Sequence, residues 1–247
     1  MTSNIFALDY PDHPFVFFSP AHWAALLVML VIFIALWIFR GWFARPQVDL
    51  RTRWFVAALL LLQELSLNLW HLSIGDWDAG STLPLHLCGA GIVLAAFLLI
   101  NRSYLLYELV YFWGLGGAIQ ALLTPDIGQY GFPHYRYFQF FVSHGSLIFA
   151  SLYMTWVAGM RPTHRSIWRV MAITNVYLVV IAIFNYLVDG NYLFICFKPT
   201  NGSIIDFMGP WPWYVLVLEV VAAVSFYIYY LPFAIKDIIT KVRQPTT

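Results

Sequence analysis

Seven long apolar runs constrain this chain more than any other feature of its sequence. A helix needs about 20 apolar residues to cross roughly 30 Å of hydrocarbon, and seven segments reach or nearly reach that length. Their predicted bounds are 22–39, 54–72, 84–100, 104–123, 138–158, 167–188 and 212–234. The chain is 61% hydrophobic and 10% charged, too few charges to coat a water-soluble globule of 247 residues. The sequence therefore predicts an all-α polytopic membrane protein, with residues 1–247 forming one seven-helix transmembrane domain.

The first apolar run is not expected to be a cleaved signal peptide. The residues before it carry Asp9 and Asp12 but no lysine or arginine, so the basic region of a signal peptide is missing. The net charge of +1 gives no reason to expect nucleic acid as a partner.

The basic residues predict an orientation. With seven spans, eleven of the thirteen lysines and arginines fall on one face of the membrane, and only Arg136 and Lys198 fall on the other. Cytoplasmic loops carry the excess of positive charge. We therefore expect the N-terminus outside and the C-terminus in the cytoplasm.

Most polar residues of the spans lie toward the end predicted to face outward. Glu64, Asn68 and His71 share one face of the second span, within about 40° at 100° per residue. The polar residues expected at this end are Glu64, Asn68, His71, His86, Cys88, Gln120, His144, Asn185, Asp189, Asn191, Tyr192, Lys198 and Glu219. Ionisable groups inside a membrane normally face the bundle interior or a wet cavity.

Each of these residues also has a purely structural interpretation. An isolated Asn or Glu on a membrane helix often serves to bind a neighbouring helix, and the glycines of WGLGG (113–117) favour close helix packing. The opposite halves of the spans, however, are nearly bare of such residues. This asymmetry favours a polar cavity that opens outward.

The stretch STLPLHLCGAG (81–91) carries the strongest chemical signal. Pro84 is expected in the first turn of the third span, which puts Cys88 near a helix N-terminus, where a thiolate is favoured. His86 and Cys88 are about 200° apart on a helix and cannot point at one spot. A base for Cys88 should therefore come from another helix, and His144 enters from the same end at a similar depth.

Several alternatives stay open for these residues. Cys88 has a structural interpretation as a small buried hydrophobe or as a disulfide partner of Cys196. His71, His86 and His144 with Glu64 form a conceivable zinc or iron site, or hold haem, although no recognised ligand spacing is present. A channel or transporter is disfavoured, because polar groups do not line a whole path and no matched helix breaks occur.

Five blocks of the sequence resemble a known family. PLHLCGAG, YFWGLGGAIQALLTPD, FPHYRYFQFFVSHG, NYLFICFKP and GPWPWY occur in an order similar to that of the YwaF-like bacterial integral membrane proteins. That family is itself similar to a eukaryotic transmembrane acyltransferase that remodels phospholipids through a cysteine. The resemblance covers about residues 60–214.

The resemblance implies that Cys88 is an acyl-accepting nucleophile, with His144 as its base and His86 beside it. A thiolate would take an acyl chain from a membrane phospholipid and pass it to a lysolipid or to water. Because acyl-CoA is cytoplasmic, a phospholipid donor suits an outward-facing site in the cell membrane. Lys198 is a candidate partner of the lipid phosphate, and Asn185 and Asn191 are candidate oxyanion donors.

The full prediction needs no cofactor and no metal. The candidate substrate-binding residues are Glu64, Asn68, His71, Gln120, Asn185, Asn191, Tyr192, Lys198 and Glu219. Two other classes remain: a non-catalytic lipid or small-ligand binder acting as a sensor or scaffold, and a metal- or haem-bearing redox protein. The sequence leaves the oligomeric state open.

Overall fold

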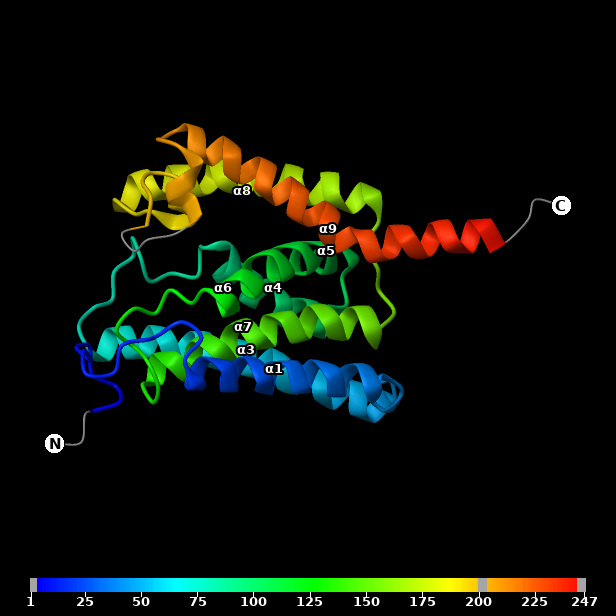
Figure 1. Ribbon diagram of the computed structural model, residues 1–247, viewed down its shortest axis with the longest axis horizontal. Helices are drawn as coiled ribbons and strands as arrows, with labels where there is room; N and C mark the ends of the chain where they lie inside the picture. The colour runs from blue at the N-terminus through cyan, green and yellow to red at the C-terminus, as the bar shows by residue number, and fades with distance from the viewer. Residues whose placement is uncertain (1–3, 200–203, 244–247) are drawn as a thin grey trace.

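The chain folds into a bundle of long helices. A computed structural model describes residues 4–199 and 204–243, and every regular element in those residues is helical. Successive long segments run back and forth along one axis, so the bundle has an amino-terminal end, where α1 begins, and a carboxyl-terminal end, where α9 ends (Figure 1). The elements are α1 Pro20–Ile38, α2 Arg40–Phe43, α3 Pro46–Ser73, α4 Leu87–Asn101, α5 Tyr104–Trp113, the π-helix η1 Gly114–Ala118, α6 Ile119–Leu123, α7 Tyr135–Trp156, α8 His164–Val188, the 3₁₀ turns η2 Tyr192–Phe194 and η3 Ile204–Met208, and α9 Trp213–Arg243.

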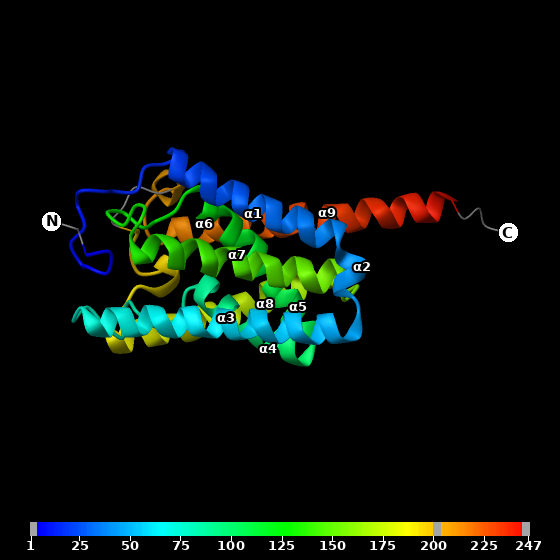
Figure 2. The same ribbon diagram turned by 90° about the horizontal axis from the view of Figure 1, so that it is seen from below.

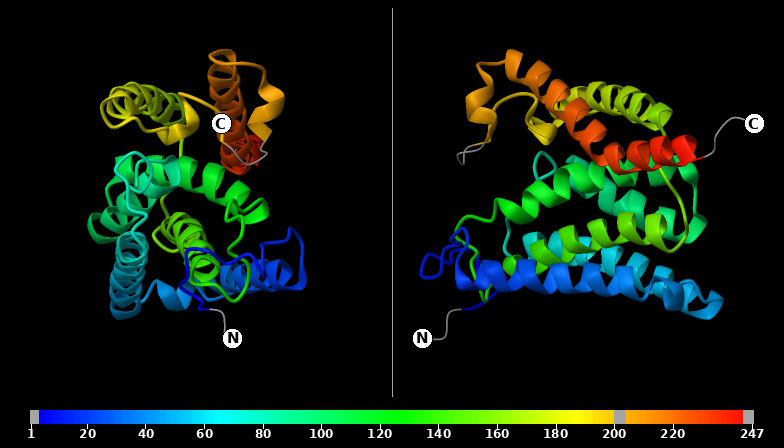
Figure 3. Two further views of the ribbon diagram at one scale, coloured as in Figure 1. Left: turned by 90° about the vertical axis from the view of Figure 1, so that its left-hand side faces the viewer. Right: turned by 45° about the vertical axis from the view of Figure 1, so that its right-hand side comes forward.

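Helix α7 lies at the centre of the bundle. It is flanked by α1 and α3 on one side and by α4, α5 and η1 on the other, while α8 and α9 lie together beyond α5 (Figures 2 and 3). Leu147 and Tyr153 of α7 are fully buried, as are Ala95 of α4 and Phe112 of α5. The best-shielded part of the molecule is therefore the contact between α4, α5 and α7.

Local sequence signals start several helices. Pro20 occupies the first turn of α1, and the Ser19 hydroxyl accepts the His22 N–H at 3.4 Å. Thr163 and Ser166 form a reciprocal capping box at the start of α8. These caps satisfy backbone N–H groups that have no partner within the helix.

Five helices are long and apolar enough to cross a membrane. They are Pro20–Ile38, Pro46–Ser73, Tyr104–Leu123, His164–Val188 and Trp213–Thr240. Large apolar side chains on them point away from the protein, for example Val31 at 64% exposure and Leu187 at 72%. Such surfaces suit lipid rather than water. The chain is thus a membrane protein, and the crossing of α4 and α7 remains a prediction.

Five predicted boundaries differ from the structure by three residues or more. Helix α7 begins at Tyr135 rather than at residue 138, and α8 begins at His164 rather than at residue 167. Helix α3 begins at Pro46 rather than at residue 54, because Asp49 and Arg53 pair with each other one turn apart at 3.1 Å. Helix α9 continues to Arg243 rather than ending at residue 234. Helix α4 begins at Leu87 rather than at residue 84, for a reason given below.

The predicted scarcity of polar groups in the halves toward the carboxyl-terminal end is also wrong. Asp49 is buried there and contacts both Arg53 and Arg102. Glu108 of α5 is fully buried and accepts hydrogen bonds from Ser166 at 2.5 Å and Arg169 at 2.7 Å. Asp49 thus joins α3 to the end of α4, and Glu108 joins α5 to α8. Hydropathy averages conceal them because one charge hardly lowers the mean of a long apolar run.

Candidate functional site

The segment before α4 folds into a turn that brings Cys88 to the start of that helix. The Leu85 N–H bonds to the Leu83 carbonyl at 2.7 Å, and this tight turn delays the helix. His86 is the N-cap, and its carbonyl accepts the Ala90 N–H at 2.9 Å. Pro84 therefore does not occupy the first turn, contrary to the prediction. It packs over Gly89 instead, where an added Cβ would lie 2.8 Å from the Pro84 Cα. Cys88 is the second residue of α4.

The Cys88 sulfur lies against the π-helix η1. A Cβ added to Gly117 would lie 2.8 Å from Cys88 Sγ, so only glycine leaves room for the sulfur there. π-helical turns are rare and occur frequently at functional sites. The glycines of WGLGG thus serve close packing, as expected, but the group that Gly117 admits is the thiol of Cys88.

A layer of contacts fixes how α4, α7 and η1 face one another. A Cβ on Gly91 of α4 or on Gly114 of η1 would contact the Leu147 side chain of α7 at 3.3–3.4 Å. Helices α4 and α7 run in the same direction and η1 runs against them (Figure 1). Cys88 precedes Gly91 by three residues, and His144 precedes Leu147 by three residues, so each lies on nearly the same face of its helix and closer to the amino-terminal end of the bundle. Gly117 follows Gly114 by three residues and lies in the same direction, because η1 runs the opposite way. Cys88 and His144 therefore lie at a similar level along the bundle, each three residues, or about 4.5 Å, outward from the layer.

His144 is held in one orientation. Its Nδ1 lies 2.9 Å from the Phe140 carbonyl, so Nδ1 carries the hydrogen that this acceptor requires. The ring lies against the Phe140 ring, with centroids 4.2 Å apart. Among the residues that the structure describes, none donates a hydrogen bond to Nε2. The neutral ring therefore offers an Nε2 lone pair, which is the form of a general base.

His86 belongs to a second group, formed with the loop after α8. Its Nδ1 accepts the Leu193 N–H at 3.3 Å, and its ring lies edge-on to the Tyr192 ring at 5.3 Å. The Tyr192 hydroxyl donates to the Ala79 carbonyl and accepts the Leu83 N–H, both at 2.8 Å. Burial raises the pKa of Tyr192, so the phenol stays protonated. Tyr192 thus fastens the loop to the segment that precedes α4.

The predicted oxyanion donors are engaged in this loop. Asn185 bonds the backbone N–H and carbonyl of Tyr192, each at 2.9 Å. Asn191 donates to the Phe197 carbonyl at 2.7 Å and accepts from two backbone N–H groups. Both amides therefore organise the chain around this loop.

Glu64 and Asn68 form a third group on α3. Asn68 Nδ2 donates to the Glu64 carbonyl at 3.1 Å and to its carboxylate at 3.4 Å, and Trp77 donates to Asn68 Oδ1 at 3.1 Å. His71 pairs with Asp76 beyond the end of the helix, with Nδ1 and Oδ2 3.2 Å apart. The predicted polar face of α3 exists, but its outermost member bonds to the following loop.

Three other candidates have surroundings of their own. Glu219 accepts a hydrogen bond from Asn175 at 3.0 Å and so joins α9 to α8. Lys198 donates to the Asp206 carbonyl at 3.3 Å and lies over the Tyr214 ring. Gln120 is exposed on α6. Their gathering with Cys88 in one cavity stays a prediction.

Sequence reasoning missed Arg136. Its side chain donates to Gln139 Oε1, and Gln139 Nε2 donates to Gln63 Oε1 of α3 at 2.6 Å. Arg136 lies within electrostatic range of Glu64 and His144, yet it forms no ion pair with any residue in the described ranges. The available signal was its spacing: residues 136, 140 and 144 recur on one helical face.

His134 anchors the segment before α1. It is fully buried, with Nε2 donating to the Ala7 carbonyl and Nδ1 accepting the Arg136 N–H, both at 3.0 Å. Burial lowers the pKa of His134 from its ordinary value of 6.5. The neutral ring is the only form that satisfies both bonds.

Two alternative interpretations find no support in the geometry. Cys88 and Cys196 are both free thiols rather than a disulfide. Within residues 4–199 and 204–243, no three His, Cys, Asp or Glu side chains gather as a metal site would need, so His71, His86, His144 and Glu64 do not assemble one.

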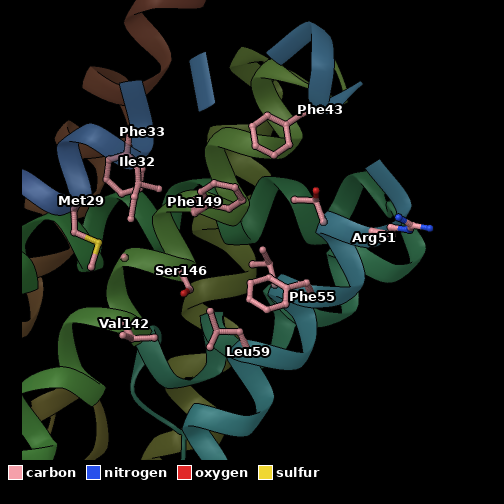
Figure 4. Close-up of a pocket in the computed structure, with 13 residues that line it drawn as sticks. Met29, Ile32, Phe33, Phe43, Arg51, Phe55, Leu59, Val142, Ser146 and Phe149 are labelled. Atoms are coloured by element: carbon pink, nitrogen blue, oxygen red, sulfur yellow. The ribbon is translucent and has the colours of Figure 1, made fainter. Parts of the chain in front are cut away.

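Two pockets are lined mainly by apolar side chains. One, of about 510 Å³, lies between α1 and α3 with α7 as its floor, and Met29, Phe55 and Phe149 are among its walls (Figure 4). The other, of about 570 Å³, lies between α8 and the start of α9 and includes Cys196 and Trp211. Neither is lined by Cys88 or His144, and neither is the predicted polar cavity.

Comparison with protein families gives one decisive match. The model of the TMEM164 family, a family of transmembrane proteins, matches residues 17–230. The chain belongs to the TMEM164 family. The match extends from just before α1 to within α9, so Cys88, His144 and Arg136 all lie in the family's shared region. It does not establish the expected YwaF-like bacterial origin. Comparisons with curated proteins and with solved structures gave no match.

Proposed function

We propose that this TMEM164-family chain is a membrane-embedded lipid acyltransferase or transacylase that works through an acyl-cysteine at Cys88. The observation that supports the proposal is the similar level of Cys88 and His144 on two helices that pack together, each three residues outward from the contact of Gly91 with Leu147. Cys88 lies in the first turn of α4, where the helix dipole favours a thiolate. His144 presents the lone pair of Nε2.

The reaction runs in two balanced steps. His144 Nε2 takes the thiol proton, Cys88 Sγ attacks the ester carbonyl carbon, and the carbon–oxygen bond of the ester breaks. The departing alkoxide takes the proton from His144 and leaves as a lysolipid, with the acyl chain on Cys88 as a thioester. A lysolipid hydroxyl, or water, then gives its proton to His144 and attacks the carbonyl carbon of the thioester. The carbon–sulfur bond breaks, His144 returns the proton to the sulfur, and a phospholipid or a free fatty acid leaves. Splitting one transfer into two lowers the barrier to each.

Arg136 suits the lipid phosphate better than Lys198. It lies on the same face of α7 as His144 and two turns closer to the amino-terminal end, and its guanidinium forms no ion pair with a described carboxylate. In a phospholipid the phosphate lies nearer the membrane surface than the ester. Arg136 would therefore hold the head group while the ester reaches Cys88.

The proposal includes a topology. Helices α4 and α7 would cross the membrane beside the five longer apolar helices, giving seven spans with the N-terminus outside the cell membrane. The distribution of lysines and arginines supports this orientation. The chemistry would then take place in the outer leaflet, with phospholipids as donors.

Intact-protein mass spectrometry in nanodiscs of native lipids tests the proposal. We expect a mass increment equal to a fatty acyl chain, removed by hydroxylamine, absent in Cys88→Ala and retained in Cys196→Ala, the matched cysteine control. His144→Gln should slow formation of the adduct. Undiminished acyl transfer by Cys88→Ala would rule out the covalent mechanism.

A specific observation also favours a second function, non-catalytic lipid binding. The pocket between α1 and α3 is lined almost wholly by apolar side chains and lies within the range of small-molecule sites. A binder needs no reactive thiol, so a Cys88 that is neither acylated nor reactive toward a small alkylating probe would favour this function.

A further inference from the structure

The apolar pocket between α1 and α3 is a lateral groove in the membrane-facing surface. Its walls are Met29, Ile32 and Phe33 of α1 and Phe55 and Leu59 of α3 (Figure 4). Ile32 and Phe55 are 41% and 69% exposed, so the groove opens sideways between two helices that meet the criteria for membrane spans. A guest would enter from the hydrocarbon of the bilayer.

Glycine gives the groove its depth. Gly145 lies in the floor, where a side chain would overlap the Met29 thioether. Gly145 faces α1, whereas Leu147 faces α4 and η1, so the groove and Cys88 lie on different sides of α7. The groove is therefore separate from the proposed catalytic site.

Arginine side chains lie at and near the end of the groove that is closest to α2. Arg51 lines it, and its guanidinium extends away from the apolar walls in Figure 4, as a long side chain does when its stem covers apolar surface and its charge reaches the interface. Arg40, the first residue of α2, and Arg45, the N-cap of α3, lie toward the same end of the bundle, and Arg40 donates to the Trp37 carbonyl at 2.8 Å. None of these three pairs with a carboxylate of the described residues. The nearest acid in the sequence, Asp49, is occupied by Arg53, Arg102 and Tyr153.

We propose that this groove binds one anionic phospholipid, with an acyl chain between α1 and α3 and its phosphate at Arg51. The volume of about 510 Å³ falls in the range of ligand pockets, and most of the lining side chains are apolar, which suits an acyl chain. Arg51, which forms no ion pair with a described carboxylate, favours a head group with net negative charge, since each basic residue near a membrane surface contributes about 1 kcal/mol toward anionic lipid. The site holds a lipid of the leaflet at the α2 end, whatever chemistry Cys88 performs.

Photocrosslinking of the full chain tests the site. The protein is placed in nanodiscs with a trace of phosphatidylglycerol or phosphatidylcholine bearing a diazirine in the acyl chain, and the crosslinked residues are mapped. We expect adducts on groove residues of α1, α3 and α7, with phosphatidylglycerol favoured. Arg51→Gln should lower that preference about fivefold, the factor that corresponds to about 1 kcal/mol, while Arg165→Gln, an exposed arginine of α8, should leave it unchanged.

A second pair of variants tests the groove itself. Leu59→Trp fills it and should abolish the adducts for both lipids, whereas Leu62→Trp, on the exposed face of the same helix, should keep them. If Leu59→Trp fails to fold, Ser146→Leu narrows the floor instead. Adducts that map elsewhere, equal yields for the two head groups, or equal effects of the two tryptophans would overturn the proposal. Because the readout needs no acyl transfer, its outcome is independent of Cys88→Ala.

Discussion

The two ends of the bundle treat their polar groups differently. At the carboxyl-terminal end, the buried carboxylates of Asp49 and Glu108 each contact a guanidinium and a hydroxyl. At the amino-terminal end, Arg136 and Glu64 share a region but bond to side-chain amides rather than to each other. Breaking a buried ion pair is costly, so the first arrangement holds helices together. The second leaves a cation and a histidine nitrogen available to a ligand.

This difference corrects an inference from composition. The sequence predicted that the halves of the spans toward the carboxyl-terminal end are nearly bare of polar residues, yet the buried carboxylates of Glu108 and Asp49 lie there. What separates the ends is whether each charge has an opposite partner. Four predictions test that distinction, in order of decreasing effect.

The largest effect should come from the pair between Glu108 and Arg169. Glu108→Gln removes the charge and leaves an amide N–H facing a donor, so we expect a loss of about 3 kcal/mol in unfolding free energy, with acyl transfer per folded molecule unchanged. Glu64→Gln, at the other end, should cost under about 1 kcal/mol because Glu64 bonds only to an amide. Unfolding in mixed micelles measures both. Equal losses of unfolding free energy in the two variants would contradict the difference between the two ends.

The next effect concerns the contact between η1 and Cys88. In Gly117→Ala the new methyl displaces Sγ, and we expect acyl transfer to fall about tenfold, or about 1.4 kcal/mol in barrier. Gly116→Ala is the matched control, since its Cβ would meet only Tyr229 and Phe226 at 3.8 Å or more. Rates are compared per folded molecule, with unfolding in mixed micelles measured for both variants, so that a loss of stability is separated from a loss of rate. Equal rates in the two variants would argue against a role for the sulfur's position.

A smaller effect should follow from the pH response of His134. Because its folded pKa is lowered, the stability it contributes is present above its unfolded value of 6.5 and is lost as pH falls below that value toward the folded pKa. Protonated Nδ1 cannot accept the Arg136 N–H, a hydrogen bond worth about 1 kcal/mol. Hydrogen exchange of residues 134–137, corrected for intrinsic rates, should therefore quicken in mildly acidic buffer. His134→Asn should flatten this dependence, and an unchanged profile in that variant would assign it to another group.

The smallest effect is expected at the pair between Arg161 and Asp237. The two side chains form two hydrogen bonds at 2.5 and 2.8 Å, but both are about 40% exposed. Exposed pairs contribute less than about 1 kcal/mol, so Asp237→Asn should barely change stability, and less still in high salt. A loss matching that of Glu108→Gln would show that exposure does not separate the pairs at this end.

Much of the fold could be predicted because apolar length is a strong signal. Each of the seven apolar runs is helical, and five helices meet the criteria for a membrane span. The errors occur where one interaction outweighs the average. The turn at Leu83–Leu85 delays α4, and the Asp49–Arg53 pair extends α3 through charged sequence.

The candidate site was less predictable. The depths of Cys88 and His144 follow from counting turns, because helical register is written in the sequence. The uses of Asn185 and Asn191 do not, since their partners are backbone groups of a loop whose path the sequence does not reveal. Arg136 was overlooked because an arginine at the end of a span was used only to assign topology. What distinguishes it in the structure is that it forms no ion pair with a described carboxylate.

The sideways opening of the groove between α1 and α3 determines how its occupancy has to be expressed. A guest arrives by diffusing within one leaflet, so the relevant concentration is a mole fraction of the surrounding lipid rather than a molarity in water. In a micelle, the detergent tails both dissolve the lipid and compete with it for the groove. An affinity measured in micelles would therefore change with the detergent chosen, while one measured in a bilayer of fixed composition would be a property of the protein.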